Sequence, residues 1–136
     1  MNKTLLVLVC IFWSVPALLV AQSMNCEKFK NGKFRSTFEG RSIVIERSGT
    51  IQTEYLTVLN GKTLKTPMVM VLNVKWLNDC TYTLSLTAES LKKYPKFPKN
   101  AVITVKIIKV NENSYTQSAT GNFSNKAAVS EVYKVD

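Results

Sequence analysis

Side chains that could do catalytic chemistry are few and scattered along this chain. It contains no histidine, so it lacks the usual general base near neutral pH and the commonest ligand of transition metals. Its 9 carboxylates form no metal-binding spacing, and there is no Gly-x-Ser-x-Gly elbow or glycine-rich phosphate loop. Glu46 and Glu54 could meet on neighbouring strands as a glycosidase-like pair, but surface charge explains them more simply. We therefore expect no catalytic residues, no metal site, no cofactor and no enzymatic activity.

Residues 92–99 have the composition of a binding surface. Two aromatic residues, Tyr94 and Phe97, are held between prolines and surrounded by four lysines, Lys92, Lys93, Lys96 and Lys99. Such a cluster could hold an anionic surface through charge and aromatic contacts. The alternative is a solvated connection whose aromatic side chains cap one end of the domain.

A second candidate is a strand-like segment that is apolar on both faces, residues 68–74. Either both faces are covered, or one face lines a cavity for an apolar ligand, to which methionine adapts well. The candidate lining residues are Met68, Met70, Leu72, Trp76, Tyr82 and Leu84. The alternative is an interior filled by its own side chains, since a small eight-stranded barrel allows either.

The N-terminus has the pattern of a signal peptide. Lys3 precedes an apolar run from Leu5 to Ala21, with Pro16 near its end. We expect residues 1–23 to be a signal peptide and residues 24–136 to be one β-barrel domain, which makes the protein secreted or periplasmic. The run of about 17 residues is at the lower limit for spanning a bilayer, so an uncleaved membrane anchor is the alternative.

Export makes a disulfide chemically available. With Cys10 in the signal, the remaining cysteines are Cys26 and Cys80, and we expect them to be bonded. Closing a loop of about 55 residues is worth on the order of 4 kcal/mol in the chain-entropy model.

The positive charge limits the choice of partners. The chain has 18 lysines and arginines against 9 acidic residues, a net charge of +9. Outside the cytoplasm such a surface favours a lipid-like molecule with an anionic head group, an anionic polysaccharide or an acidic envelope protein, and nucleic acid is not expected. A merely solubilising surface is the alternative. We expect a monomer.

Apolar residues alternate with polar ones from Phe29 onward, which predicts β-strands. The segment 88–94 has the one helix-like composition, and Pro95 and Pro98 end it. Eight short strands joined mostly by hairpin turns predict an all-β fold, a small antiparallel meander closed as a barrel, with one short helical turn. A β-sandwich is the alternative.

The turn residues predict how the strands pair. Asn60-Gly61 is the strongest hairpin signal. Gly49 fits the left-handed position of a three-residue loop that sets Ile45 opposite Ile51. Pro67 indicates that a strand starts there or lies at an edge. A loop of residues 77–79 makes the apolar faces agree, with Trp76 opposite Cys80, Val74 opposite Tyr82 and Leu72 opposite Leu84.

Two motifs, Cys26-x-x-Phe29-x-x-Gly32-x-Phe34 and Trp76-x-x-Asp79-Cys80-x-Tyr82, resemble those of a family of small exported bacterial proteins. The resemblance spans roughly residues 26 to 86, including Arg47 and residues 52–54, and implies a lipocalin-like barrel. Members often carry the inherited label "DNA topoisomerase IV". We do not expect that activity, because a type II topoisomerase needs an ATP-binding domain and a metal-binding acidic cluster in a large assembly.

The functional hypothesis is a non-enzymatic binding module for an apolar or amphiphilic ligand or for an anionic surface. The alternative is a secreted protein-interaction or inhibitor module with a filled core.

Overall fold

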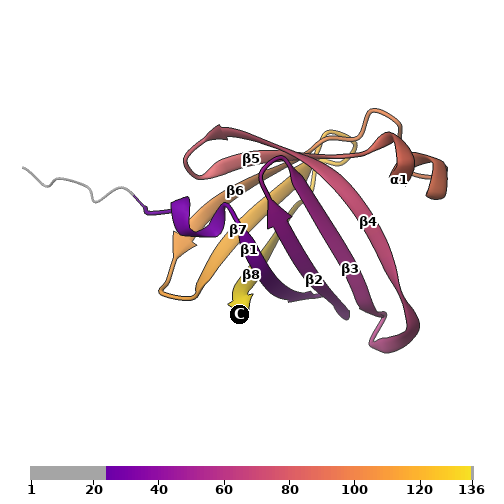
Figure 1. The fold of residues 1–136 in the computed structure, drawn as a ribbon, viewed down its shortest axis with the longest axis horizontal. Helices are drawn as coiled ribbons and strands as arrows, with labels where there is room; N and C mark the ends of the chain where they lie inside the picture. The colour runs from indigo at the N-terminus through magenta and orange to yellow at the C-terminus, as the bar shows by residue number, and fades with distance from the viewer. Residues whose placement is uncertain (1–23, 136) are drawn as a thin grey trace, which may run out of the picture.

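Each strand pairs antiparallel with the next along the chain, and the first pairs with the last, in a computed structural model that describes residues 24–135 (Figure 1). The strands are β1 (Gly32–Phe38), β2 (Arg41–Ser48), β3 (Ile51–Leu59), β4 (Lys62–Asn78), β5 (Thr81–Leu86), β6 (Ile103–Val110), β7 (Ser114–Gly121) and β8 (Ala127–Val135). The predicted meander barrel is confirmed, and pairing of β1 with β8 closes it, which a sandwich would not do. The predicted signal peptide, 1–23, lies outside the described residues.

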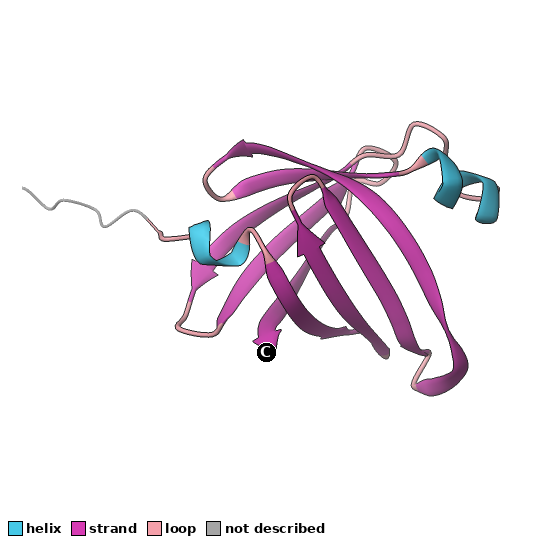
Figure 2. Cartoon of the chain, in the orientation of Figure 1, coloured by secondary structure: helices cyan, strands magenta, loops and turns pink. Residues whose placement is uncertain are grey.

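Within residues 24–135, two short helices lie at opposite ends of the barrel (Figure 2). The 3-10 turn η1 (Glu27–Phe29) precedes β1, and the helix α1 (Ala88–Lys93) follows β5, where the sequence predicts it. Thr87 caps α1 by accepting a hydrogen bond from the Ser90 amide at 3.3 Å. Among the described residues, no helix is long and apolar enough to cross a membrane.

The Asn60-Gly61 hairpin is confirmed. Leu59 pairs with Lys62, and both turn residues have positive φ, 52° and 74°. This is the type I′ arrangement whose twist matches that of the flanking strands.

The hairpin at Gly49 forms, but its predicted register is wrong. Gly49 has the expected positive φ of 59°, yet the loop has two residues, and Ile45 pairs with Glu54 rather than with Ile51. Because side chains alternate between the faces of a strand, Ile51 points outward and Gln52 points inward. The buried Arg47 accounts for this register, since its side chain bonds that of Gln52.

The register predicted between β4 and β5 is also wrong, by two residues. Trp76 pairs with Tyr82, Val74 with Leu84 and Leu72 with Leu86. The turn consists of residues 79 and 80, and a bulge between Trp76 and Asn78 takes up the extra residue, leaving Leu77 exposed. Both strands keep their apolar faces inward in this register, so the hydrophobic pattern alone did not select between the two.

Pro67 does not begin a strand, because β4 runs on both sides of it. Leu56 pairs with Met68 and Val58 pairs with Thr63, so residues 64–67 bulge out of the ladder. Proline lacks the amide hydrogen that a paired position needs, and the bulge removes that need.

Beyond the end of β5, the α1 segment forms hydrogen bonds with the edge of β4. Leu86, the last residue of β5, pairs with Leu72. Beyond this point the Val71 amide donates to Ser90 Oγ at 2.9 Å, and the Thr87 amide donates to the Val71 carbonyl at 3.1 Å. These bonds satisfy a strand edge that would otherwise be open and place the loop after α1 beside the barrel.

The predicted disulfide between Cys26 and Cys80 is confirmed, with a Cα–Cα distance of 5.4 Å. It ties η1 to the β4–β5 turn at the end of the barrel opposite α1. A structural disulfide indicates an oxidising, extracytoplasmic compartment.

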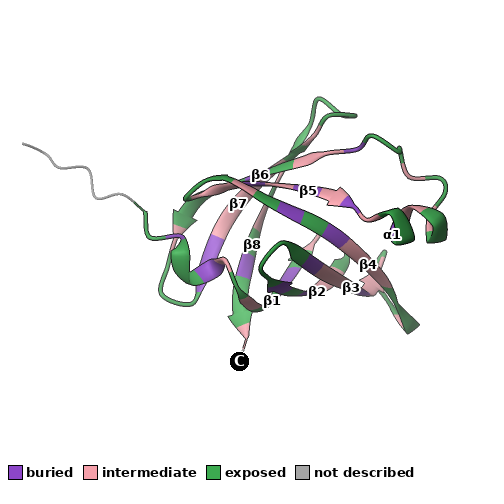
Figure 3. Cartoon of the chain, turned by 45° about the horizontal axis from the view of Figure 1, so that its top comes forward, coloured by how far each residue is buried: buried purple, intermediate pink, exposed green. Residues whose placement is uncertain are grey.

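Buried and exposed residues alternate along the strands (Figure 3). One core cluster fills the η1 end of the barrel and consists of Cys26, Phe29, Phe34, Ile45, Ile107, Tyr115 and Val132. A second lies along β4, β5 and β6 and consists of Leu72, Val74, Tyr82, Leu84, Leu86 and Val105. The η1 end of the barrel is therefore closed.

Candidate functional site

Arg47 lies inside the closed end of the barrel and is only 2% exposed. Its Nε donates to Gln52 Oε1 at 2.6 Å, and its Nη1 donates to the Phe29 carbonyl at 2.8 Å. Nη2 donates to the hydroxyl oxygens of Tyr82 at 2.9 Å and Tyr115 at 3.2 Å. One guanidinium thus joins η1, β3, β5 and β7, a use of its rigid fork of donors that lysine does not offer.

Aromatic rings surround the same guanidinium. Its central carbon lies 4.6 Å from the ring centre of Tyr82, 5.2 Å from that of Phe34 and 5.9 Å from that of Trp76. Burial lowers the pKa of Arg47, but Tyr82, Tyr115 and Glu54 raise it by more, so the net pKa is raised. The pKa of Tyr82 is raised well above its ordinary value, chiefly by burial and then by Tyr115. Arg47 therefore stays charged and the Tyr82 phenol stays neutral at physiological pH.

Glu54 continues this network toward the other end of the barrel. Gln52, which accepts from Arg47, donates through Nε2 to Glu54 Oε1 at 2.6 Å. Burial raises the pKa of the Glu54 carboxyl by more than the bond from Gln52 and the charge of Arg47 lower it. The assignment of Glu54 to surface charge is wrong, because the side chain faces the interior.

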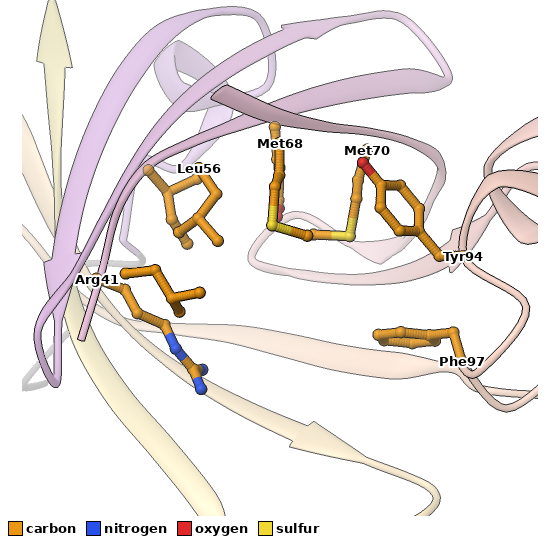
Figure 4. A pocket seen from close by; sticks show the side chains of 9 residues that line it. Arg41, Leu56, Met68, Met70, Tyr94 and Phe97 are labelled. Atoms are coloured by element: carbon orange, nitrogen blue, oxygen red, sulfur yellow. The ribbon is translucent and has the colours of Figure 1, made fainter. Parts of the chain in front are cut away.

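A cavity of about 280 Å³ opens at the α1 end of the barrel (Figure 4). It is lined by Arg41, Ile43, Glu54, Leu56, Leu59, Met68, Met70, Tyr94 and Phe97. At roughly 30 Å³ for each water molecule in the liquid, this space is far larger than a packing defect. Its walls are apolar or aromatic except at Glu54 and Arg41, which lie at opposite ends of the cavity.

Glu54 marks the floor of the cavity and Arg41 its mouth. Glu54 is the lining residue of β3 nearest to Gln52 and hence to the closed end, whereas Arg41 is exposed beside the β1–β2 turn. Figure 4 shows Met68, Met70, Leu56 and Phe97 around one common space. The cavity is therefore largely apolar, with a carboxyl group at its inner end and a guanidinium at its outer end.

Tyr94 and Phe97, from the loop after α1, form one side of the mouth. The Tyr94 hydroxyl donates to the Val69 carbonyl at 2.8 Å, which fixes the loop to β4. The Phe97 ring packs edge-on against Phe123, with 6.2 Å between the ring centres. These contacts fix the loop after α1 to β4 and to Phe123 in the loop after β7.

The six residues predicted to line a cavity fall into two groups. Met68 and Met70 line it. Leu72, Tyr82 and Leu84 are packed in the second core cluster, and Trp76 packs against both clusters with its ring 4.6 Å from that of Tyr82. The prediction overlooked Glu54, whose place among the inward-facing residues of β3, between Gln52 and Leu56, would have been visible in a correct register.

The four lysines predicted to bind an anionic surface are all exposed on α1 and the loop that follows it. The Lys93 ammonium lies 5.6 Å from the ring centre of Tyr94, and Lys93 and Lys96 border a shallow depression formed by residues 93–98. Two of its residues, Tyr94 and Phe97, also line the cavity. The basic cluster thus stands beside the mouth.

Within residues 24–135, no group of three or more histidine, cysteine or acidic side chains is placed to hold a metal ion. The fold and the site define a small, disulfide-bonded antiparallel β-barrel, closed at one end and hollow at the other. Comparison of the chain with protein-family models, curated proteins and solved structures finds no match. These comparisons therefore show no family for the chain, and the resemblance to exported bacterial proteins stays a prediction from the two sequence motifs.

Proposed function

We propose that this protein is a non-enzymatic binding module that holds one small amphiphilic molecule in the cavity at the α1 end of the barrel. The observation that supports this is the cavity itself, an apolar space with a polar group at each end. A pocket of this kind binds by excluding water from apolar surface and orients its ligand with a few polar contacts. The alternative, a protein-interaction module with a filled core, does not require such a cavity.

The size of the space limits the ligand. About 280 Å³ is just below the range of roughly 300 to 1,000 Å³ typical of small-molecule sites, which suits one short alkyl chain or two or three aromatic rings rather than a two-chain lipid. Met68 and Met70 suit a ligand of irregular shape, because the unbranched methionine side chain adapts its conformation.

The test uses the neutral fluorophore N-phenyl-1-naphthylamine, whose emission rises when it leaves water. We expect a saturable rise with the folded protein. Met70→Trp puts a larger side chain into the cavity beside Glu54, its partner in the β3–β4 pairing, and should weaken binding at least tenfold. Ile108→Trp adds the same ring at an exposed site on β6 and should not weaken it. No saturable rise with the wild-type protein, or equal binding by Met70→Trp, would refute the proposal.

A second candidate function is docking on an anionic surface through Lys92, Lys93, Lys96 and Lys99. Their exposure beside the mouth favours it, because a lipid surface held there would be next to the cavity. Replacing all four by glutamine should abolish retention on phosphatidylglycerol vesicles at low salt. The control replaces Lys33, Lys75, Lys106 and Lys109, which lie on strands toward the closed end. Equal losses in the two variants would show a general charge effect and no docking surface.

A further inference from the structure

The floor of the cavity offers one acceptor to a ligand. Glu54 Oε1 already accepts the bond from Gln52. The contacts of the described residues include no donor to the second oxygen, Oε2, and none of their buried side-chain polar atoms lacks a partner. Oε2 is therefore reachable from the cavity, and a ligand that reaches the floor meets a carboxyl oxygen with free lone pairs.

The charges at this place already balance. The four direct acceptors of Arg47 are a carbonyl, an amide oxygen and two phenol oxygens, and none of them is a carboxylate. Glu54, one hydrogen-bonded residue away, is the carboxylate that acts on Arg47 through its charge. When Glu54 is ionised, the pair has no net charge. The exposed Arg41 at the mouth is in contact with water and cannot balance a charge at the floor.

A charged head group at the floor would disturb this balance. A carboxylate would be repelled by Glu54 and left without a buried partner. An ammonium group would pair with Glu54 but take away the counter-charge of Arg47. Burying an unbalanced charge is unfavourable, whereas an uncharged hydroxyl group gives Oε2 a hydrogen bond and adds no charge.

We propose that Glu54 binds the polar end of the ligand, and that the cavity selects uncharged amphiphiles with a hydrogen-bond donor, such as alkyl alcohols. Alkyl carboxylates and alkylammonium ions of the same length bind more weakly. This inference rests on the proposed function, because it requires that a ligand enters the cavity.

The experiment compares two isomers, 1-octanol and 1-methoxyheptane, as competitors of N-phenyl-1-naphthylamine. They have the same atoms and nearly the same apolar surface, but the ether has no donor. A hydrogen bond to a charged group is worth about 1.5 to 3 kcal/mol. Octanol should therefore compete at a concentration at least about tenfold lower than that of the ether. Octanoate and octylammonium should compete more weakly than octanol.

Two variants at Glu54 test whether this residue causes the preference for octanol over the ether. Glu54→Leu removes the acceptor and should make the two isomers equal competitors. Glu54→Gln keeps an acceptor but leaves the charge of Arg47 unbalanced, so octanoate should improve relative to octanol. The matched control is Glu46→Leu, which removes a carboxylate from the outer face of the neighbouring strand and should leave the preference for octanol unchanged.

The outcomes separate the two proposals. If the fluorophore binds and both isomers displace it equally from the wild-type protein, the role of Glu54 is refuted while the binding function stands. If the fluorophore does not bind, the binding function itself fails. Because the isomers are compared on the wild-type protein, a variant that does not fold leaves the test intact.

Discussion

Arg47 and Glu54 face the interior of the barrel from adjacent strands, and the side chain of Gln52 connects them by accepting from one and donating to the other. This relay links a closed end that is held together by a buried charge to an open end that contains a cavity. Arg47, which joins several elements of the barrel, and Glu54, which lines the cavity, therefore belong to one hydrogen-bonded network.

Replacing Arg47 by methionine should destabilise the protein by about 3 kcal/mol or more, because removing one member of a buried polar network leaves its partners unpaired. Urea unfolding measures the loss. Arg35→Met, on the exposed face of β1, is the control and should stay within about 0.5 kcal/mol of the wild type. A loss below about 1 kcal/mol for Arg47→Met would show that the network contributes little to stability.

Removing the Cys26–Cys80 disulfide should lower the free energy of unfolding by about 4 kcal/mol, because the bond closes a loop with a sequence separation of 54 residues. The double variant Cys26→Ser, Cys80→Ser and the wild-type protein in reductant should unfold at the same urea concentration. Reductant should leave the double variant unchanged. A wild-type protein equally stable with and without reductant would contradict this prediction.

The raised pKa of Glu54 predicts how stability depends on pH. A carboxyl group whose pKa is higher in the folded state stabilises that state fully below its unfolded pKa of about 4.3, and this contribution is lost as the pH rises through the folded pKa. The free energy of unfolding of the wild type, relative to Glu54→Gln, should therefore fall as the pH rises above about 4 and passes through the raised folded pKa. Urea unfolding at several pH values measures the difference, with Glu46→Gln as the control. A difference that rises with pH would mean that the charge of Arg47 outweighs burial.

Tyr94→Phe should cost about 1 kcal/mol of stability, because it removes the hydrogen bond from the Tyr94 hydroxyl to the Val69 carbonyl. The same substitution should loosen the mouth and speed the dissociation of N-phenyl-1-naphthylamine, measured by stopped-flow fluorescence. Tyr55→Phe is the matched control, since the Tyr55 hydroxyl makes one exposed bond, to Glu46 at 3.4 Å. Equal dissociation rates in the two variants would show that this bond does not hold the mouth.

The sequence alone determined the class of fold. Alternation of apolar residues places the strands because a half-buried strand has a period of two, and Asn60-Gly61 marks a hairpin because both positions require positive φ. The pair Cys26 and Cys80 also followed from the sequence, since the predicted signal peptide contains Cys10 and leaves these two as the remaining partners.

Only the tertiary structure decided the register at two hairpins and the place of the charged residues inside. A shift of two residues between β4 and β5 leaves the same apolar faces inward, so the hydrophobic pattern cannot distinguish Trp76 opposite Tyr82 from Trp76 opposite Cys80. Arg47 is of a residue type usually found at the surface, and it lies inside because acceptors distant in the chain, Phe29 and Tyr115, reach it. Glu54 is joined to Arg47 through Gln52. Such long-range pairing satisfies a buried charge and leaves no local periodicity to read.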